Sequence, residues 1–297
     1  MSVLAETESL DYDPAFAEQA VPAVAEFFGM TEIEARRRVD REMRSPGSTV
    51  AEAWRLASPR SPDEVNRFYR ETDSYVYDLV VARCHPRAND VQDAVITRIG
   101  RLGPARSVLL FGDGIGTDSI AIARAGHRVT YFDLPGLTSG FARFRFEREH
   151  LPTPVVVLED QADIPFETFD AVVCTEVLEH VPDPPAVMRA LHSALRHGGI
   201  ALITESFESI GEEFPSHLPE NFRYAGRTHR IMENLGFANT YYNIDPINRP
   251  MEFTKIGPGS SGKWLRFKSR LRRRVEGRVR SLTSKRASKP VGVRNGN

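Results

Sequence analysis

Three glycines at alternate positions mark the stretch of this sequence whose residue types best suit ligand chemistry. Gly112, Gly114 and Gly116 follow the apolar run 107–111, and glycine lets a backbone turn sharply and approach a ligand closely. The next apolar run ends in Asp133. In a strand–turn–helix–strand unit, an acid at that place accepts hydrogen bonds from the two free hydroxyls of a ribose. The spacing therefore predicts a nucleoside site.

The residue two positions after Gly116 indicates which kind of nucleoside derivative binds. In dinucleotide-binding proteins this register carries a third glycine, which packs over a pyrophosphate, whereas here it is Asp118. A carboxylate at a helix N-terminus suits the helix dipole but repels phosphate. We therefore expect a cationic ligand without phosphate, and an NAD-dependent reductase is the less favoured alternative.

This combination resembles the class I S-adenosylmethionine-dependent methyltransferases over roughly residues 106–253. The resemblance implies that the glycines border the methionine part of the cofactor, that Asp133 binds the ribose, and that Asp160 accepts a hydrogen bond from adenine. The expected cofactor-binding residues are Gly112, Asp113, Gly114, Gly116, Asp133, Leu134, Asp160, Gln161 and Thr175.

The chain departs from the family pattern at one position. Family members usually carry an acid two residues before the first glycine, where this sequence has Leu110. We therefore expect Asp113 or Asp118 to hold the ammonium group of the cofactor. The same departure keeps open a different class of function, a protein that binds the cofactor without turnover.

A second cluster of polar residues, Cys-Thr-Glu-Val-Leu-Glu-His-Val at 174–181, follows the expected strand 169–174. Ligands of open α/β sheets bind outside the carboxyl ends of the strands. The octapeptide resembles the ubiquinone-pathway O-methyltransferases, in which an E-x-x-E-H stretch binds a divalent cation. The resemblance implies that Glu176, Glu179 and His180 bind Mg²⁺, which would lower the pKa of an acceptor hydroxyl. The alternative is that this stretch only shapes the turn into the next helix.

Two histidines are candidates for the catalytic base. His217 lies in a loop after the expected strand 200–205, and the free imidazole has a pKa near neutral pH, which suits proton uptake from a hydroxyl. His180 is its rival. A surface role is the alternative for a lone loop histidine.

The hydrophobic pattern predicts an α/β fold. Strands are expected at 107–111, 128–132, 155–158, 169–174, 200–205, 237–243 and 251–255, and helices at 14–28, 31–43, 49–56, 63–71, 89–99, 139–150 and 184–197, with a further helix starting at Thr117. Alternating strands and helices predict a mainly parallel sheet. We expect a Rossmann-like methyltransferase sheet with an antiparallel far edge. The expected domains are an N-terminal helical cap (1–100), the S-adenosylmethionine-binding domain (101–256) and a tail (257–297).

Composition and charge bound the class of protein. The 297 residues are enough for a sizeable core, and no run of eighteen apolar residues would span a membrane. Two cysteines, Cys84 and Cys174, give no disulfide framework. The N-terminus lacks the basic and then apolar pattern of a signal peptide. We expect a cytoplasmic protein with reduced thiols.

The tail has the opposite charge to the rest of the chain. The formal net charge is −1, yet residues 257–297 carry thirteen Lys or Arg and a single acid. Apolar residues spaced by three or four place an apolar face on a basic helix at 263–282, which suits an anionic membrane surface or an acidic partner. We expect peripheral binding at the inner membrane face, with docking on the acidic body as the alternative. Nucleic acid is not expected, because aromatic interleaving is sparse.

These observations predict an S-adenosylmethionine-dependent methyltransferase that acts on a small-molecule or glycan acceptor at oxygen. The nearest alternative is an N-methyltransferase of an amine or amino sugar. Methyl transfer needs little beyond alignment of the nucleophile with the methyl group, so a sharper catalytic motif is not expected.

Overall fold

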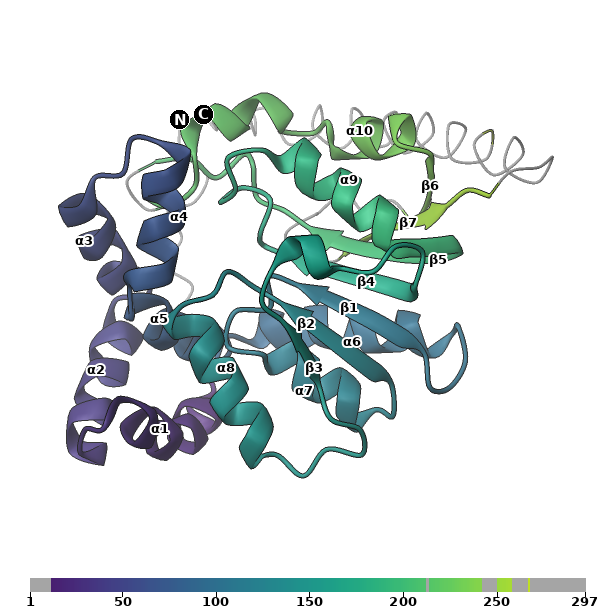
Figure 1. Cartoon of the computed structure of the whole chain (residues 1–297). Coiled ribbons are helices and arrows are strands. Elements are labelled where there is room, and N and C mark those ends of the chain that lie inside the picture. Colours follow the sequence, from purple (N-terminus) through teal and green to yellow (C-terminus); the bar gives the residue numbers. More distant parts are fainter. Residues whose placement is uncertain (1–11, 212–213, 242–249, 258–266, 268–297) are drawn as a thin grey trace, which may run out of the picture.

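A seven-stranded sheet forms the centre of the protein. The computed structural model describes residues 12–211, 214–241, 250–257 and 267. The strands are β1 (Ser107–Phe111), β2 (Arg128–Phe132), β3 (Val156–Leu158), β4 (Phe169–Thr175), β5 (Leu195–Thr204), β6 (Phe237–Tyr241) and β7 (Met251–Lys255). Their order is β3-β2-β1-β4-β5-β7-β6 (Figure 1). Strands β1 to β5 pair in parallel, and β7 runs antiparallel to both β5 and β6. The predicted mainly parallel sheet with an antiparallel far edge is confirmed.

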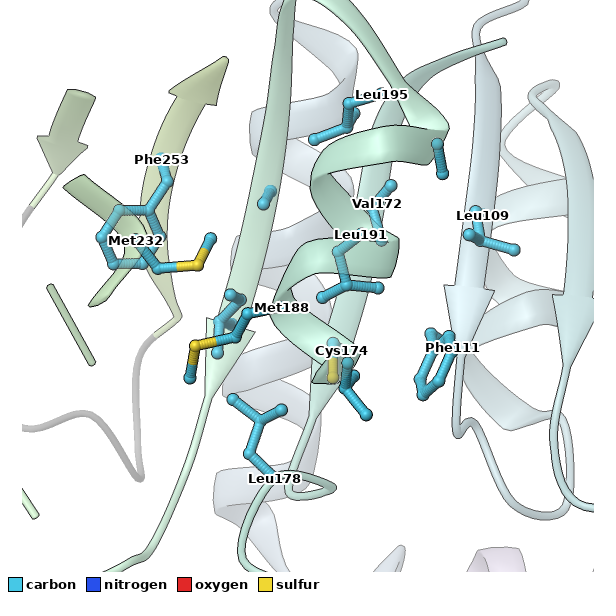
Figure 2. Close-up of a cluster of buried hydrophobic side chains, with 14 of the residues drawn as sticks. Leu109, Phe111, Val172, Cys174, Leu178, Met188, Leu191, Leu195, Met232 and Phe253 are labelled. Atoms are coloured by element: carbon cyan, nitrogen blue, oxygen red, sulfur yellow. The ribbon is translucent and has the colours of Figure 1, made fainter. Parts of the chain in front are cut away.

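Helices cover both faces of this sheet. On one face lie α6 (Pro86–Gly100), α7 (Thr117–Arg124) and α8 (Leu137–Arg148), and on the other lie α9 (Pro184–Ala194) and α10 (Thr228–Asn234). Figure 2 shows α9 packed over β4 and β5, with Leu191 and Met188 among the buried side chains. Short 3₁₀ helices, η1 (Gln161–Asp163) and η2 (Pro219–Tyr224), lie in the loops.

Strand β1 is apolar from Val108 to Phe111 because both of its faces are buried there. Leu109 and Phe111 pack in the cluster beneath α9, whereas Val108 and Leu110 pack in the cluster beneath α6 and α7. Alternate residues of a strand point to opposite faces. A strand covered on both sides therefore reads as an unbroken apolar run, as predicted.

Five helices precede α6 in the described chain: α1 (Ala15–Phe28), α2 (Glu32–Arg44), α3 (Ser48–Ala57), α4 (Pro62–Glu71) and α5 (Ser74–Ala82). The predicted capping box of Thr31 and Glu34 starts α2. Helices α1, α2 and α5 share a hydrophobic cluster that also contains Ile115 of the glycine turn and Phe141 of α8. The N-terminal helices are therefore packed directly on the elements that border the expected nucleoside site (Figure 1).

The structure differs from the sequence-based prediction in several elements. Helices α5 and α10 were not predicted as helices. The helix at 184–197 was predicted too long: α9 ends at Ala194, and Leu195 starts β5. Leu195 pairs with Phe169 and is fully buried, so the gain from burying it in the sheet outweighs the helical propensity of the segment.

Several predictions fall outside the described residues. They include most of the basic tail helix at 263–282 and the last two residues of the strand predicted at 237–243. Within the described part of the chain, no helix combines the length and the apolar character needed to cross a membrane.

Candidate functional site

The glycine turn joins β1 to α7 at the carboxyl edge of the sheet. Gly112, Gly114 and Gly116 have φ angles of 77°, 53° and 76°, a left-handed region that other residues rarely adopt. A Cβ atom would lie 2.5 Å from Val177 at Gly112 and 2.5 Å from Phe146 at Gly116. The glycines are therefore required both by the shape of the turn and by the close packing of the protein's own side chains.

Asp133 lies directly beside this turn, at the end of β2. Its two carboxylate oxygens accept hydrogen bonds from the backbone N–H groups of Gly114 and Leu134, each at 2.7 Å. Each oxygen keeps a further lone pair, so the geometry fits an additional role in accepting ribose hydroxyls. Burial raises the pKa of Asp133 to about 6.

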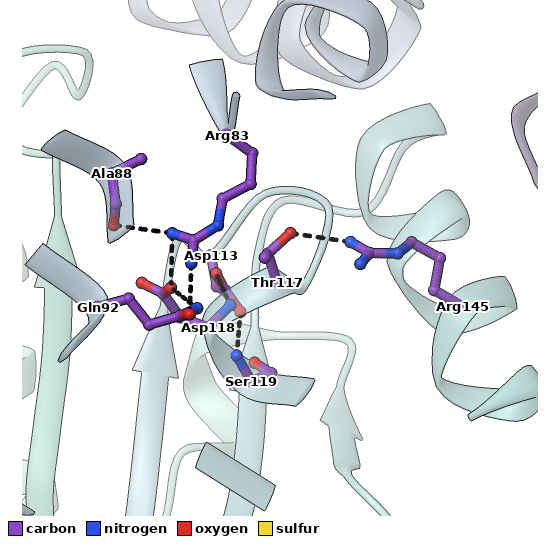
Figure 3. A network of polar contacts seen from close by, with 8 residues as sticks. All are labelled: Arg83, Ala88, Gln92, Asp113, Thr117, Asp118, Ser119 and Arg145. Carbon is purple, nitrogen blue, oxygen red and sulfur yellow. Dashed lines mark hydrogen bonds and ion pairs between the residues drawn. The ribbon is translucent and has the colours of Figure 1, made fainter. Parts of the chain in front are cut away.

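Asp113 and Asp118, the two acids expected to hold an ammonium group, are both engaged within the protein (Figure 3). The Asp113 carboxylate accepts hydrogen bonds from the N–H groups of Asp118, at 3.2 Å, and Ser119, at 2.7 Å. Burial and the charge of Asp118 raise the pKa of Asp113 to about 7. Asp118 accepts a hydrogen bond from Gln92 at 2.7 Å and lies 3.8 Å from Arg83. In this structure both acids fix the start of α7 and attach it to its neighbours.

The other expected cofactor residues lie at the ends of strands. Leu110, at the position where family members usually carry an acid, is buried in the core. Asp160 and Gln161 are exposed just beyond β3, where the Asp160 side chain accepts a hydrogen bond from the N–H of Ala162. Thr175 ends β4, in register with the end of β5. The roles of Asp160, Gln161 and Thr175 in cofactor binding stay predictions.

Two acids meet at the ends of β4 and β5. The Ser206 hydroxyl lies 2.7 Å from a carboxylate oxygen of Glu176 and 2.7 Å from one of Glu179. A hydroxyl has one hydrogen to donate, so satisfying both contacts requires a proton on one carboxyl group. Burial raises the pKa of Glu179, whose side chain is fully enclosed.

The structure brings the two candidate bases together. The rings of His180 and His217 lie 4.6 Å apart between centroids and are perpendicular. The Nδ1 of His217 is 2.7 Å from the carbonyl oxygen of Ser209. Because a carbonyl oxygen only accepts, Nδ1 carries the hydrogen and Nε2 keeps a free lone pair. Burial lowers the pKa of each histidine to about 4.

Two tyrosines complete this cluster, and sequence reasoning did not single them out. The Tyr69 hydroxyl, from α4, lies 2.9 Å from Nδ1 of His180, which is also 3.2 Å from the carbonyl oxygen of Ser216. Tyr75, from α5, stacks on Tyr69 and donates a hydrogen bond to its hydroxyl at 3.2 Å. The aromatic-rich segment at 68–77 was the available signal, although it did not distinguish these tyrosines from core residues.

The predicted Mg²⁺ ligands do not converge as a set. Among the described residues, the side chains whose ligand atoms all lie within 4.8 Å of one another are Glu179, His180 and His217. Glu176 is held by Ser206 instead. Mg²⁺ prefers oxygen ligands, whereas two of the three converging donors are imidazole nitrogens. The donor set therefore does not fit Mg²⁺.

Comparison with known proteins gives partial relatives. The chain is 40% identical over 103 residues to a ubiquinone biosynthesis O-methyltransferase of Xanthomonas campestris pv. campestris (strain B100), covering 34% of this chain and 43% of that protein. It is 35% identical over 101 residues to the enzyme of that name from Aeromonas salmonicida, covering 33% and 42%. The chain thus spans less than half the length of these curated relatives.

The solved structures that the chain matches are more distant in sequence. Magnesium protoporphyrin IX methyltransferase from Synechocystis PCC 6803, with bound S-adenosylmethionine, is 18% identical, covers 73% of this chain and 97% of its own, and has a TM-score of 0.46. A Haemonchus contortus phosphoethanolamine N-methyltransferase 2 is 20% identical, covers 65% and 44%, and has a TM-score of 0.42.

A family model described as a methyltransferase domain matches residues 69–242, which is more than half of the chain. The match begins at Tyr69 and includes the glycine turn, Asp133 and the cluster around His180 and His217. The chain therefore belongs to the methyltransferase domain family, within the class I S-adenosylmethionine-dependent methyltransferases.

Proposed function

We propose that this protein transfers the methyl group of S-adenosylmethionine to a hydroxyl oxygen of a small-molecule or glycan acceptor. One observation carries the proposal: a cluster of proton-accepting side chains directly adjoins the glycine turn. Val177, in the segment that bears Glu179 and His180, packs against Gly112. A hydroxyl at the cluster would therefore lie next to a nucleoside held at the turn.

The cofactor half of the site rests on Asp133 and the glycine turn. The carboxylate of Asp133 is fixed by two backbone N–H groups and keeps lone pairs for ribose hydroxyls. The bound cofactor supplies an electrophilic methyl group on sulfur. The protein then has to align an acceptor with that methyl group and exclude water from it.

The acceptor half favours oxygen because a hydroxyl has to lose its proton to become a good nucleophile. The hydrogen bond from Nδ1 of His217 to the Ser209 carbonyl places the ring hydrogen on Nδ1 and the lone pair on Nε2, which makes this histidine the candidate base, with His180 beside it. Relatives that share a third of the chain are named as O-methyltransferases. Neither N-methylation nor binding without turnover has comparable support.

A panel assay tests the proposal. The protein would be incubated with labelled S-adenosylmethionine and with matched pairs of acceptors that differ only in carrying a hydroxyl or an amine. We expect transfer to hydroxyl acceptors, and a kcat about 10²–10⁴-fold lower for His217→Ala with unchanged cofactor affinity. His197→Ala, which removes a surface histidine that faces Glu167, is the control and should behave as wild type. Transfer to amines alone would favour the N-methyltransferase alternative, and cofactor binding without any transfer would favour a binding protein.

A further inference from the structure

We infer that Glu179, His180 and His217 form a binding site for a transition-metal ion of the Zn²⁺ type. Their ligand atoms lie within 4.8 Å of one another. In a tetrahedral zinc site with bonds of about 2.0–2.1 Å, the ligand atoms lie about 3.4 Å apart. A closure of at most about 1.4 Å, within the reach of small side-chain rotations, would complete the site.

The carboxylate of Glu179 supplies the first independent support for a ligand. The side chain is fully buried, and its Oε1 accepts a hydrogen bond from Ser206. Its Oε2 is buried and has no hydrogen-bond partner. Leaving a buried carboxylate oxygen without a partner is costly, and a cation between Oε2 and the two imidazoles would remove that cost.

The two histidines are oriented as metal ligands usually are. Histidines that bind metals generally donate their second ring N–H to a carbonyl, a carboxylate or water, which fixes the ring and the tautomer. His217 does so through Nδ1 to the Ser209 carbonyl at 2.7 Å. The Nδ1 of His180 lies 3.2 Å from the Ser216 carbonyl and 2.9 Å from the Tyr69 hydroxyl. In His217 this hydrogen bond leaves the lone pair on Nε2, and in His180 a hydrogen bond from Nδ1 to the Ser216 carbonyl would do the same.

The surroundings of the cluster are acidic and lack a fixed counter-charge. Glu176 shares the Ser206 hydroxyl with Glu179, and Glu205 is buried nearby with partners Thr228 and the N–H of Phe207. Within the described ranges, none of these three glutamates forms a salt bridge with Lys or Arg. A proton on one of the two carboxyl groups at Ser206 neutralises that group, and a divalent cation would balance the charge of the other.

The donor types select the metal. Two imidazoles and one carboxylate with an open fourth position are a donor set found in catalytic zinc sites, and imidazole suits Zn²⁺ and its first-row neighbours. Mg²⁺ would require oxygen ligands in octahedral geometry. The inference therefore replaces the expected Mg²⁺ and its ligand Glu176 with a Zn²⁺-type ion and the ligand His217.

This inference concerns the cluster to which the proposed function assigns hydroxyl activation, but metal binding can be measured without any methyl transfer. When bound, such a cation lowers the pKa of a hydroxyl that coordinates to it. The ion would then take the lone pairs that otherwise make His217 a base.

Direct metal titration of the chelator-treated full-length protein tests the site. We expect one equivalent of Zn²⁺ to bind by calorimetry, Co²⁺ to give the visible absorption of a tetrahedral site, and Mg²⁺ to give no heat. Glu179→Gln and His217→Ala should each abolish the stoichiometric site and the Co²⁺ absorption. Tyr69→Phe, which removes a partner of His180, should weaken Zn²⁺ about tenfold.

His197→Ala controls for binding by surface histidines and should retain the full site. Thermal unfolding of each variant shows whether the fold survives, and Glu179→Gln keeps the size of the side chain. The inference is wrong if wild type and His217→Ala bind Zn²⁺ and Co²⁺ alike, or if Mg²⁺ binds as well as Zn²⁺. Stoichiometric Zn²⁺ binding without methyl transfer would refute the proposed function alone, and transfer by a protein that binds no metal would refute this inference alone.

Discussion

Replacing Asp133 by alanine tests the assignment of the cofactor site. The Asp133 carboxylate is half-buried and accepts hydrogen bonds from the N–H groups of Gly114 and Leu134. If it also accepts the ribose hydroxyls, Asp133→Ala leaves those hydroxyls without a partner when the cofactor binds. The expected loss is about 1–3 kcal/mol, or about 5- to 150-fold in the dissociation constant.

The same substitution also acts on the fold, and this effect has to be separated from binding. Each stranded backbone N–H should lower the free energy of unfolding by about 1–3 kcal/mol. Asp170→Ala is the control, because Asp170 also accepts a hydrogen bond from a backbone N–H, that of Ser107 at 2.9 Å, and in addition pairs with Arg196 at 3.1 Å. Asp170 and Ser107 lie at the amino ends of their strands, at the opposite edge of the sheet. We expect Asp170→Ala to lose stability and to keep its cofactor affinity.

The assay pairs calorimetric titration with S-adenosylhomocysteine and urea unfolding on the same preparations. A lower affinity for Asp133→Ala alone, with reduced stability for both variants, would support the assignment. An Asp133→Ala protein that unfolds more easily but binds the cofactor as wild type does would show that Asp133 only braces the glycine turn, and the reasoning would fail.

Three further predictions concern pH, the glycine turn and the tail. The pKa of Asp133 is raised to about 6, so its carboxylate is ionised above that pH. Cofactor affinity should therefore fall in wild type as the pH drops through 6, whereas the affinity of Asp133→Asn should not change. Gly116→Ala should lower the free energy of unfolding by about 2–5 kcal/mol, because Gly116 has a positive φ and a Cβ atom there would clash with Phe146. Gly126 has a positive φ but open space around it, so Gly126→Ala should lower the free energy of unfolding by about 1–2 kcal/mol. Urea unfolding of the two variants compares these losses. Deletion of residues 258–297 should reduce sedimentation with anionic vesicles at low salt and leave cofactor affinity unchanged; equal sedimentation of both proteins would contradict a membrane role for the tail.

Local patterns in the sequence were sufficient to predict the sheet and the glycine turn. Strand β1 is apolar on both faces because helices cover both, so its apolar run could be recognised without knowing its neighbours. The positive φ angles of Gly112, Gly114 and Gly116 are adopted readily by glycine alone. Asp133 could be predicted from the same strand–turn–helix–strand unit, because the residue that follows a parallel strand lies at the carboxyl edge of the sheet.

Only the tertiary structure decided which polar side chains act together. Asp113 and Asp118 suit an ammonium ligand by type, yet the start of α7 and the side chains of Arg83 and Gln92 take up their carboxylates. Leu195 has the propensity to continue a helix, but its burial beside Phe169 makes it a strand residue. In each case a contact from a distant segment outweighs the local preference.

The cluster at the ends of β4 and β5 shows the same limit for function. Glu179 and His180 are neighbours in the sequence, but His217 comes from a loop after β5 and Tyr69 from a helix that precedes β1. Their meeting depends on the pairing of β4 with β5 and on the contact of Tyr69 in α4 with His180. The sequence could therefore identify each side chain as a candidate by its residue type. Which partners determine where its hydrogen and its lone pair lie was decided by the fold.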